Sequence, residues 1–221
     1  MSDARLTLYG YWRSSSSWRV RIALAWKRLA YEYVAVHLLK EGGEQHQRAF
    51  RALNPMEQVP VLGVREGSRS LHLRQSLAII EYLEERWPAP PLLPSERGER
   101  AQARALAELV NSGIQPLQNL GVLQHVRDAL GGDERAWAAH WVGRGLEALE
   151  QAVRESAGTY CVGDAVSYAD LCLIPQLYSA RRFGVEVDAY PTLTAIEARC
   201  ATLDAFREAH AERQSDAVAA G

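Results

Sequence analysis

The chain lacks the sequence patterns of several common enzyme classes. Its 221 residues contain no P-loop, no G-x-G-x-x-G run and no G-x-S-x-G run, which removes the simplest nucleotide-binding and serine-hydrolase interpretations. The six histidines form no H-x-x-x-H pair, so we expect no metal site. The three cysteines form no C-x-x-C pair, and apolar residues surround each of them in the sequence. We therefore interpret Cys161, Cys172 and Cys200 as buried free thiols.

Long hydrophobic runs and excess charge of either sign are also absent. No apolar stretch approaches the roughly 20 residues that span a bilayer, and the first residues lack the basic and then apolar pattern of a secretion signal. The 25 basic and 27 acidic side chains leave a net charge of −2, which excludes a strongly basic arm for nucleic acid. With 48% hydrophobic residues the composition is that of a globular protein. We expect a folded cytoplasmic protein with no membrane or nucleic-acid partner.

Residues 1–87 alternate between strand and helix patterns. We expect strands over 5–9 and 31–37 around a helix over 18–28, a hairpin formed by 59–64 and 70–73, and a helix over 77–87 that Ser76 caps. The order strand, helix, strand indicates a parallel β-α-β unit. These patterns predict an α/β domain.

The proline-rich stretch 88–94 cannot continue a helix, because proline lacks the amide donor and clashes with the preceding turn. We expect a linker there. Strand-like alternation ends beyond it, and residues 95–221 are expected to form an all-helical domain with helices over 96–129, 134–155, 168–183 and 192–206. Ser167 and Asp170 have the spacing of a capping box, to which we assign a role in folding.

Four consecutive serines, Ser14 to Ser17, lie between the first strand and the first helix. Backbone amides at a helix start point outward without partners, so an anion can bind there and a thiol held there would have a lowered pKa. The alternative is a polar turn with an ordinary N-cap.

Two further segments have features of a binding site. Pro60 stands at the entry of a strand, where a cis peptide bond would turn the Val59 backbone toward an extended peptide; a trans proline that starts an edge strand is the alternative. Gln75 and Ser76 lie at a second helix start, which can hold a carboxylate or serve only as a cap.

Five segments, taken together and in order, resemble the zeta class of the cytosolic glutathione transferases over nearly the whole chain. They are Ser14-Ser-Ser-Ser-Trp-Arg-Val-Arg-Ile-Ala-Leu24, Ala52-Leu-Asn-Pro-Met-Glu-Gln-Val-Pro60, Gln75-Ser-Leu-Ala-Ile-Ile-Glu-Tyr-Leu-Glu-Glu85, Gly113-Ile-Gln-Pro-Leu-Gln-Asn119 and Tyr160-Cys-Val-Gly-Asp164. The resemblance implies a thioredoxin-like N-terminal domain that binds glutathione, an all-α C-terminal domain that contributes the pocket for the other substrate, and a homodimer.

The resemblance also implies a set of site residues. The positions that match glutathione contacts of the class are Ser14, Ser15, Ser16, Ser17, Trp18, Arg19, Gln45, Val59, Pro60, Gln75, Ser76, Gln115, Asn119, Leu120 and Gly121. Ser14 and Ser15 are the implied catalytic positions, with the Ser14 hydroxyl donating to the glutathione sulfur. Arg13 and Arg182 are the expected partners of substrate carboxylates, and a solvated surface arginine is the alternative for each.

The reaction implied by the class is the cis–trans isomerisation of maleylacetoacetate to fumarylacetoacetate in tyrosine and phenylalanine degradation. The glutathione thiolate adds to the conjugated double bond, the resulting single bond rotates, and elimination restores the thiol and gives the trans alkene. Three alternatives remain: isomerisation of maleylpyruvate, glutathione transfer or dehalogenation on α-haloacids, and a non-catalytic interaction module.

The sequence departs from the zeta pattern at three places. Ser16 stands where the class usually has a cysteine, so we expect no role for a protein thiol at that position. Gly121 stands where a serine is common, and the segment 63–74 is a few residues longer than usual, which predicts a longer hairpin rim.

Overall fold

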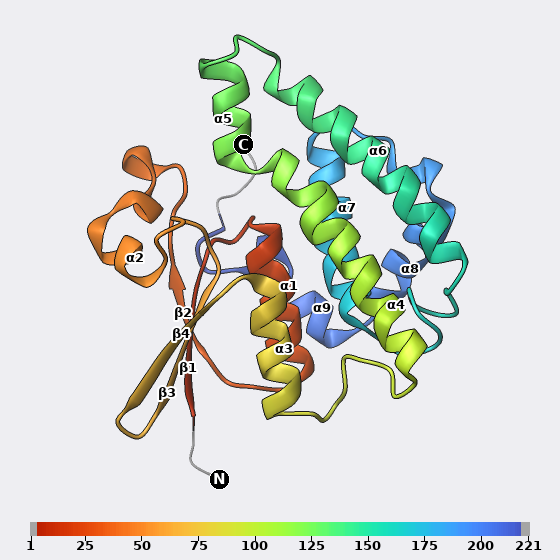
Figure 1. The fold of residues 1–221 in the computed structure, drawn as a ribbon, viewed down its shortest axis with the longest axis horizontal. Coiled ribbons are helices and arrows are strands. Elements are labelled where there is room, and N and C mark those ends of the chain that lie inside the picture. Colours follow the sequence, from red (N-terminus) through yellow and green to blue (C-terminus); the bar gives the residue numbers. More distant parts are fainter. Residues whose placement is uncertain (1–3, 218–221) are drawn as a thin grey trace. The chain divides into compact units, whose positions relative to one another are not determined.

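The computed structural model describes residues 4–217, which form two compact units (Figure 1). The first contains the described residues up to Pro90 together with those from Asp204 onward, and the second is Pro91–Leu203. The domain ranges 1–87, 88–94 and 95–221 stay a prediction, and the segment from Asp204 groups with the first unit although the sequence placed it with the later helices.

The first unit is built on a mixed sheet of four strands with the order β2-β1-β3-β4. The strands are β1 (Arg5–Gly10), β2 (Glu32–Ala35), β3 (Val61–Glu66) and β4 (Arg69–Arg74). Strand β2 runs parallel to β1, whereas β3 is antiparallel to both β1 and β4. The predicted β-α-β unit and the predicted hairpin are therefore confirmed.

Helices cover both faces of the sheet, and the first four residues of β3, whose side chains point to alternate faces, are all buried. The helices of this unit are α1 (Ser15–Trp26), α2 (Arg48–Leu53), α3 (Ser76–Arg86) and α9 (Asp204–Glu208). In Figure 1, α1 and α3 lie side by side on one face of the sheet and α2 lies on the other. Phe50 of α2 packs in one apolar cluster with Val36 and Val61, which Tyr9 joins.

The regular elements described in the second unit are all helices or helical turns. Its elements are α4 (Arg97–Glu108), a π-helical turn (Leu109–Ile114), a 3-10 turn (Gln115–Gln118), α5 (Leu120–Asp128), α6 (Glu134–Arg154), α7 (Tyr168–Arg182), a 3-10 turn (Val187–Ala189) and α8 (Pro191–Cys200). The predicted fold class, thioredoxin-like α/β followed by all-α, is confirmed.

Three details of the helix predictions are wrong. The helix predicted over 96–129 is interrupted by the π turn and by a 3-10 turn whose second residue is Pro116, because proline cannot supply the amide that a continuous helix needs there. The helix predicted over 192–206 divides at 201–203 into α8 and α9. Helix α2 and the short 3-10 turns Lys40–Gly42, Glu44–His46 and Ala211–Arg213 were not predicted.

Candidate functional site

One end of the sheet collects most of the sequence-predicted site residues of the first unit. Tyr9 near the end of β1 pairs with Val61 at the start of β3, and Val61 pairs with Arg74 at the end of β4. The serine run begins four positions after the end of β1, Val59 and Pro60 come directly before β3, and Gln75 and Ser76 come directly after β4. Strand pairing therefore brings these three segments to the same end of the sheet.

The serine run starts α1. Ser14 is the N-cap residue, and its side-chain oxygen accepts the backbone N–H of Ser17 at 3.2 Å. Ser15 and Ser17 are buried, Ser16 is half-buried, and no acidic residue lies in the first turn. The first turn thus keeps outward amides and no negative side chain, which favours an anion. The N-cap interpretation is confirmed, and it leaves the hydroxyl hydrogen of Ser14 available, since a hydroxyl donates once and accepts twice.

Helix α1 continues with two residues that the resemblance places at the site. Trp18 is almost fully buried, and its ring meets the His210 ring edge-on at a centroid distance of 4.8 Å. Arg19 is fully buried, and its Nη1 donates to the Ser76 hydroxyl oxygen at 3.1 Å. This hydrogen bond joins α1 to the first residue of α3.

The start of α3 has a corresponding arrangement. Gln75 occupies the N-cap position with φ +69°, its side chain makes no capping hydrogen bond, and Ser76 is the first helical residue. The prediction that Ser76 caps α3 is thus wrong by one position. Because a guanidinium has donors only, Ser76 must accept from Arg19, which leaves its own hydroxyl hydrogen for another acceptor.

The loop before α1 is held by two residues that the sequence did not single out. Arg21 is fully buried and donates to the carbonyls of Tyr11 (3.3 Å) and Trp12 (2.8 Å). Asp216, near the end of the chain, accepts the backbone N–H of Trp12 at 2.9 Å. Burial lowers the pKa of Arg21, an effect that the nearby Tyr33 opposes. No local sequence signal joins Trp12 to a residue 204 positions away.

Val59 and Pro60 lie just outside the sheet. The peptide bond between them is cis, as the sequence suggested, and both ladders of β3 begin only at Val61. Gln45 lies in the 3-10 turn Glu44–His46, in the segment that follows β2, and is 5% exposed.

The second unit holds the other predicted contacts within seven residues. Gln115 starts the 3-10 turn, Asn119 is the N-cap of α5, and Leu120 and Gly121 are the first residues of α5. Gln118 in the same turn exchanges two amide hydrogen bonds with Gln176 of α7, at 3.0 and 3.3 Å. The turn is therefore fixed to α7.

The two candidate arginines lie in different units. Arg13 is half-buried, and its guanidinium carbon lies 5.2 Å from the centroid of the Trp12 ring. Arg182 is the last residue of α7, is exposed, and lies 5.3 Å from the centroid of the Phe183 ring. Each guanidinium therefore makes a cation–π contact with the aromatic ring of a neighbouring residue.

The three protein thiols lie far from the serine run in the sequence, and burial disfavours the thiolate form of two of them. Cys161, Cys172 and Cys200 are free and buried in the second unit. Burial, together with the nearby Asp170 carboxylate, raises the pKa values of Cys161 and Cys200 well above the ordinary range. Within residues 4–217 no group of three or more His, Cys, Asp or Glu side chains could hold a metal ion. None of the helices in that range combines the length and apolar character that a bilayer crossing requires.

Comparisons with known proteins agree with this geometry. The family model of the glutathione S-transferase N-terminal domain matches residues 8–91, and that of the C-terminal domain matches residues 138–204. A probable maleylacetoacetate isomerase of Vibrio cholerae is 50% identical over 215 residues, which cover 96% of this chain and 98% of that protein.

Solved structures give the same result. The crystal structure of maleylacetoacetate isomerase from Anaeromyxobacter dehalogenans, with glutathione bound in its active site, is 54% identical with a TM-score of 0.91 and covers 99% of this chain and 100% of that one. A bacterial maleylpyruvate isomerase described as a zeta-class glutathione S-transferase is 44% identical with a TM-score of 0.88, covering 96% and 100%. The fold and the two helix starts define a thioredoxin-like ligand-binding unit. The chain belongs to the glutathione S-transferase family, in its zeta class.

Proposed function

We propose that the protein is a glutathione-dependent isomerase that converts maleylacetoacetate to fumarylacetoacetate. The observation that carries the proposal is the chemistry of the α1 start, which offers hydroxyls and open amides but no thiol. Such a site stabilises a thiolate without containing one, so the nucleophile belongs to the bound ligand. Similarity to named maleylacetoacetate isomerases supports this substrate.

The residues at this end of the sheet match separate chemical groups of glutathione. Its sulfur suits the start of α1, where the Ser14 hydroxyl has a hydrogen to donate. A carboxylate of glutathione suits the start of α3. Ser76 accepts a hydrogen bond from Arg19 there, so its own hydroxyl hydrogen can be donated to the carboxylate, and no acidic residue lies in the first turn. We further propose that the cysteinyl backbone pairs with Val59 and that Gln115, Asn119, Leu120 and Gly121 contribute from the second unit.

The reaction needs few groups from the protein. Bound glutathione supplies a thiolate that adds to the conjugated double bond and leaves again after rotation. Ser14, with Ser15 beside it, donates a hydrogen bond to the sulfur and so keeps it ionised at neutral pH. The α1 amides contribute in the same direction, because the positive end of a helix favours negative charge.

Arg13 and Arg182 are proposed to bind the substrate carboxylates. Charge-assisted hydrogen bonds from a guanidinium to a carboxylate are among the stronger polar contacts in proteins, and the same cations stabilise negative charge on the substrate carbonyl oxygen. A further structure of the Anaeromyxobacter enzyme that contains dicarboxyethyl glutathione and citrate supports a site for carboxylated ligands.

Isomerisation of maleylpyruvate is the second candidate, and the 44% identity to a zeta-class maleylpyruvate isomerase favours it. By family resemblance, maleylpyruvate isomerases carry a histidine and an arginine-rich stretch in the segment that matches Gln115 to Gly121. This chain has neither residue type from Gln115 to Val122, which argues for the first candidate. Both reactions use the same glutathione chemistry and differ in the second carbonyl substituent.

The test measures cis-to-trans conversion of maleylacetone and of maleylpyruvate, each with and without glutathione. The proposal predicts turnover that requires glutathione and is faster with maleylacetone. Faster conversion of maleylpyruvate would transfer the assignment to the second candidate. Equal rates without glutathione would contradict both.

Three wider parts of the proposal follow from the class. We propose a homodimer, which sedimentation or light scattering checks by a mass near twice 24.6 kDa. We also propose a cytoplasmic location and a role in tyrosine and phenylalanine degradation. The three free, buried cysteines support a reducing compartment, because exported proteins usually contain disulfides.

A further inference from the structure

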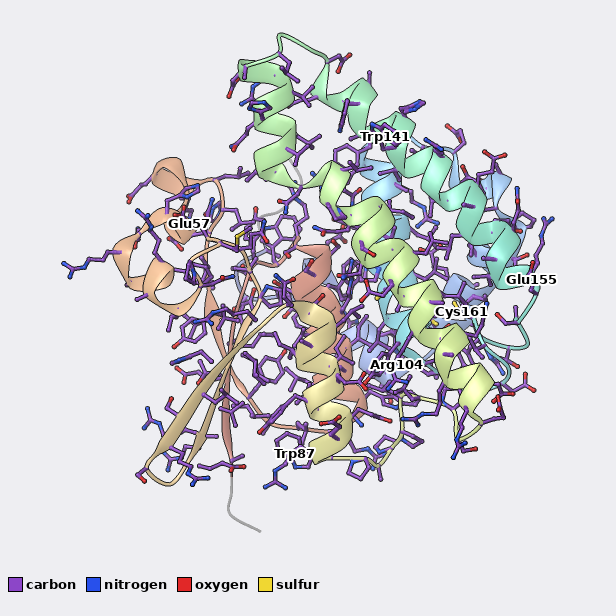
Figure 2. All side chains as sticks on the ribbon, in the orientation of Figure 1. Glu57, Trp87, Arg104, Trp141, Glu155 and Cys161 are labelled. Atoms are coloured by element: carbon purple, nitrogen blue, oxygen red, sulfur yellow. The ribbon has the colours of Figure 1, made fainter. Side chains whose placement is uncertain are left out.

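A hydrogen-bonded chain of three side chains leads from the surface to Gln45. Glu57 bonds to Nδ1 of His46, and Nε2 of His46 lies 3.0 Å from Nε2 of the Gln45 amide. Glu57 follows the α2 segment in sequence and is labelled beside α2 in Figure 2. The His46 side chain is 54% exposed, whereas Gln45 is 5% exposed, so the chain runs inward.

The Gln45 amide and the Glu57 carboxylate, at the two ends of this series of side chains, fix which atom donates in each hydrogen bond. The Gln45 amide nitrogen has donors only, so Nε2 of His46 must be the acceptor and carry no proton. Nδ1 then carries the ring proton and donates it to the Glu57 carboxylate. The carboxylate holds His46 in the Nδ1–H tautomer, and this bond lowers the pKa of Glu57.

The orientation of the Gln45 amide follows from this tautomer. Its nitrogen faces His46 and also reaches the Leu38 carbonyl at 3.4 Å. Its oxygen, Oε1, is buried and has no hydrogen-bond partner among the residues that the structure describes. Gly43, with φ +104°, makes room for the amide, because a Cβ there would come within 2.4 Å of the Gln45 nitrogen.

A buried carbonyl oxygen without a donor is unfavourable, so the arrangement is incomplete without a ligand that donates a hydrogen bond. Glutathione carries two peptide N–H groups and an ammonium group, and any of these can supply the missing hydrogen, whereas its carboxylates cannot. Oε1 of Gln45 is therefore expected to face one of the N–H groups of glutathione and not one of its carboxylates.

We infer that His46 and Glu57 are positioning residues for glutathione, which hold the Gln45 amide so that Oε1 accepts an N–H of the ligand. The inference rests on the proposed function, since it takes glutathione as the ligand. Neither His46 nor Glu57 touches the ligand in this arrangement, and both act through Gln45.

The first test needs no variant. Nitrogen-15 NMR of the imidazole rings in the unliganded wild-type protein at neutral pH distinguishes a protonated from an unprotonated nitrogen. We expect His46 to carry its proton on Nδ1. His37 is the internal reference, because its Nδ1 accepts the N–H groups of Leu39 and Lys40 and its proton must lie on Nε2. The Nε2–H tautomer at His46 would overturn the inference.

The second test measures glutathione affinity by calorimetry, with thermal melts as a check of folding. We expect His46→Phe and Gln45→Met each to weaken binding about threefold to tenfold, as loss of one hydrogen bond predicts. The double variant should bind no more weakly than Gln45→Met, since His46 acts through Gln45. Arg51→Ala is the matched control, because Arg51 also pairs with Glu57 but lies off the path to Gln45, and it should bind as wild type does.

The outcomes separate this inference from the proposed function. Wild-type affinity in folded His46→Phe, or full additivity in the double variant, would overturn the positioning role and leave the isomerase proposal intact. A wild-type protein that binds no glutathione would contradict the isomerase proposal, and the positioning role with it.

Discussion

At the scale of single residues, Ser14 combines a structural role with a proposed chemical one. Its oxygen caps α1 and its hydrogen is available to the ligand sulfur. We expect Ser14→Ala to reduce turnover by about tenfold to a thousandfold, because one preorganised donor to a developing charge contributes on that order. Initial rates with maleylacetone at saturating glutathione measure the effect.

Two variants control for the loss of the cap. Ser14→Thr keeps both the acceptor and the hydrogen and should retain most of the turnover. Ser16→Ala leaves the Ser14 cap intact and should have the smaller effect of the two alanine variants. A larger loss in Ser16→Ala than in Ser14→Ala would mean that the wrong serine has been assigned.

The adjacent arginines of α7 allow a matched comparison. Arg181 donates to Glu197, at 2.6 Å for one of two hydrogen bonds, and Arg182 lies against the Phe183 ring; of the two, only Arg182 is proposed to bind the substrate. We expect Arg182→Ala to raise the KM for the dicarboxylate substrate maleylacetoacetate about tenfold, which is the effect of losing one charge-assisted hydrogen bond. Steady-state kinetics should show little change in KM for Arg181→Ala. Equal effects of the two changes would contradict a substrate contact at Arg182.

At the scale of elements, the start of α7 depends on one buried carboxylate. Asp170 is fully buried and accepts the N–H of Cys161 (2.9 Å), the N–H of Ser167 (2.7 Å) and the Ser167 hydroxyl (2.9 Å). We expect Asp170→Ala to lower the free energy of unfolding by about 2 to 4 kcal/mol, because it leaves three buried donors unpaired. Urea unfolding measures this, and Asp164→Ala, a change at an exposed carboxylate, should cost less.

The same carboxylate gives a pH dependence of known sign. Burial raises the pKa of Asp170 above its ordinary value, although hydrogen bonds from Cys161 and Ser167 lower it in part. The native state therefore holds this proton at a pH where the unfolded chain has lost it, and the associated stability is lost as pH rises through that interval. The free energy of unfolding of wild type minus that of Asp170→Asn should become smaller as the pH rises above the ordinary pKa of aspartate. A difference that widens would contradict the assignment.

The secondary structure could be predicted wherever local pattern decides it. The alternation in β1 and the spacing of Ser167 and Asp170 are local signals, and both features are present. The breaks within the predicted helix 96–129 were missed because its apolar spacing continues across Pro116. Pro116 is the local cause of the break, and the Gln118–Gln176 hydrogen bond that fixes the resulting turn joins residues 58 positions apart, which local pattern does not predict.

At the scale of the whole molecule, contacts between distant segments could not be predicted. Asp216 supports Trp12, and Arg19 supports Ser76, through hydrogen bonds that span 204 and 57 positions. Sequence pattern identified the segments at this end of the sheet but not the side chains that orient them. The link from Glu57 through His46 to Gln45 was missed for the same reason, since it depends on the path of the segment between β2 and β3, which contains α2.

In the proposed mechanism the bound ligand supplies the nucleophile and the protein supplies none. The most direct measurement compares isomerisation of maleylacetone with glutathione and with S-methylglutathione, which keeps the peptide but has no free thiol. We predict that S-methylglutathione binds competitively with glutathione and supports no turnover. Turnover with S-methylglutathione at a rate close to that with glutathione would contradict the claim.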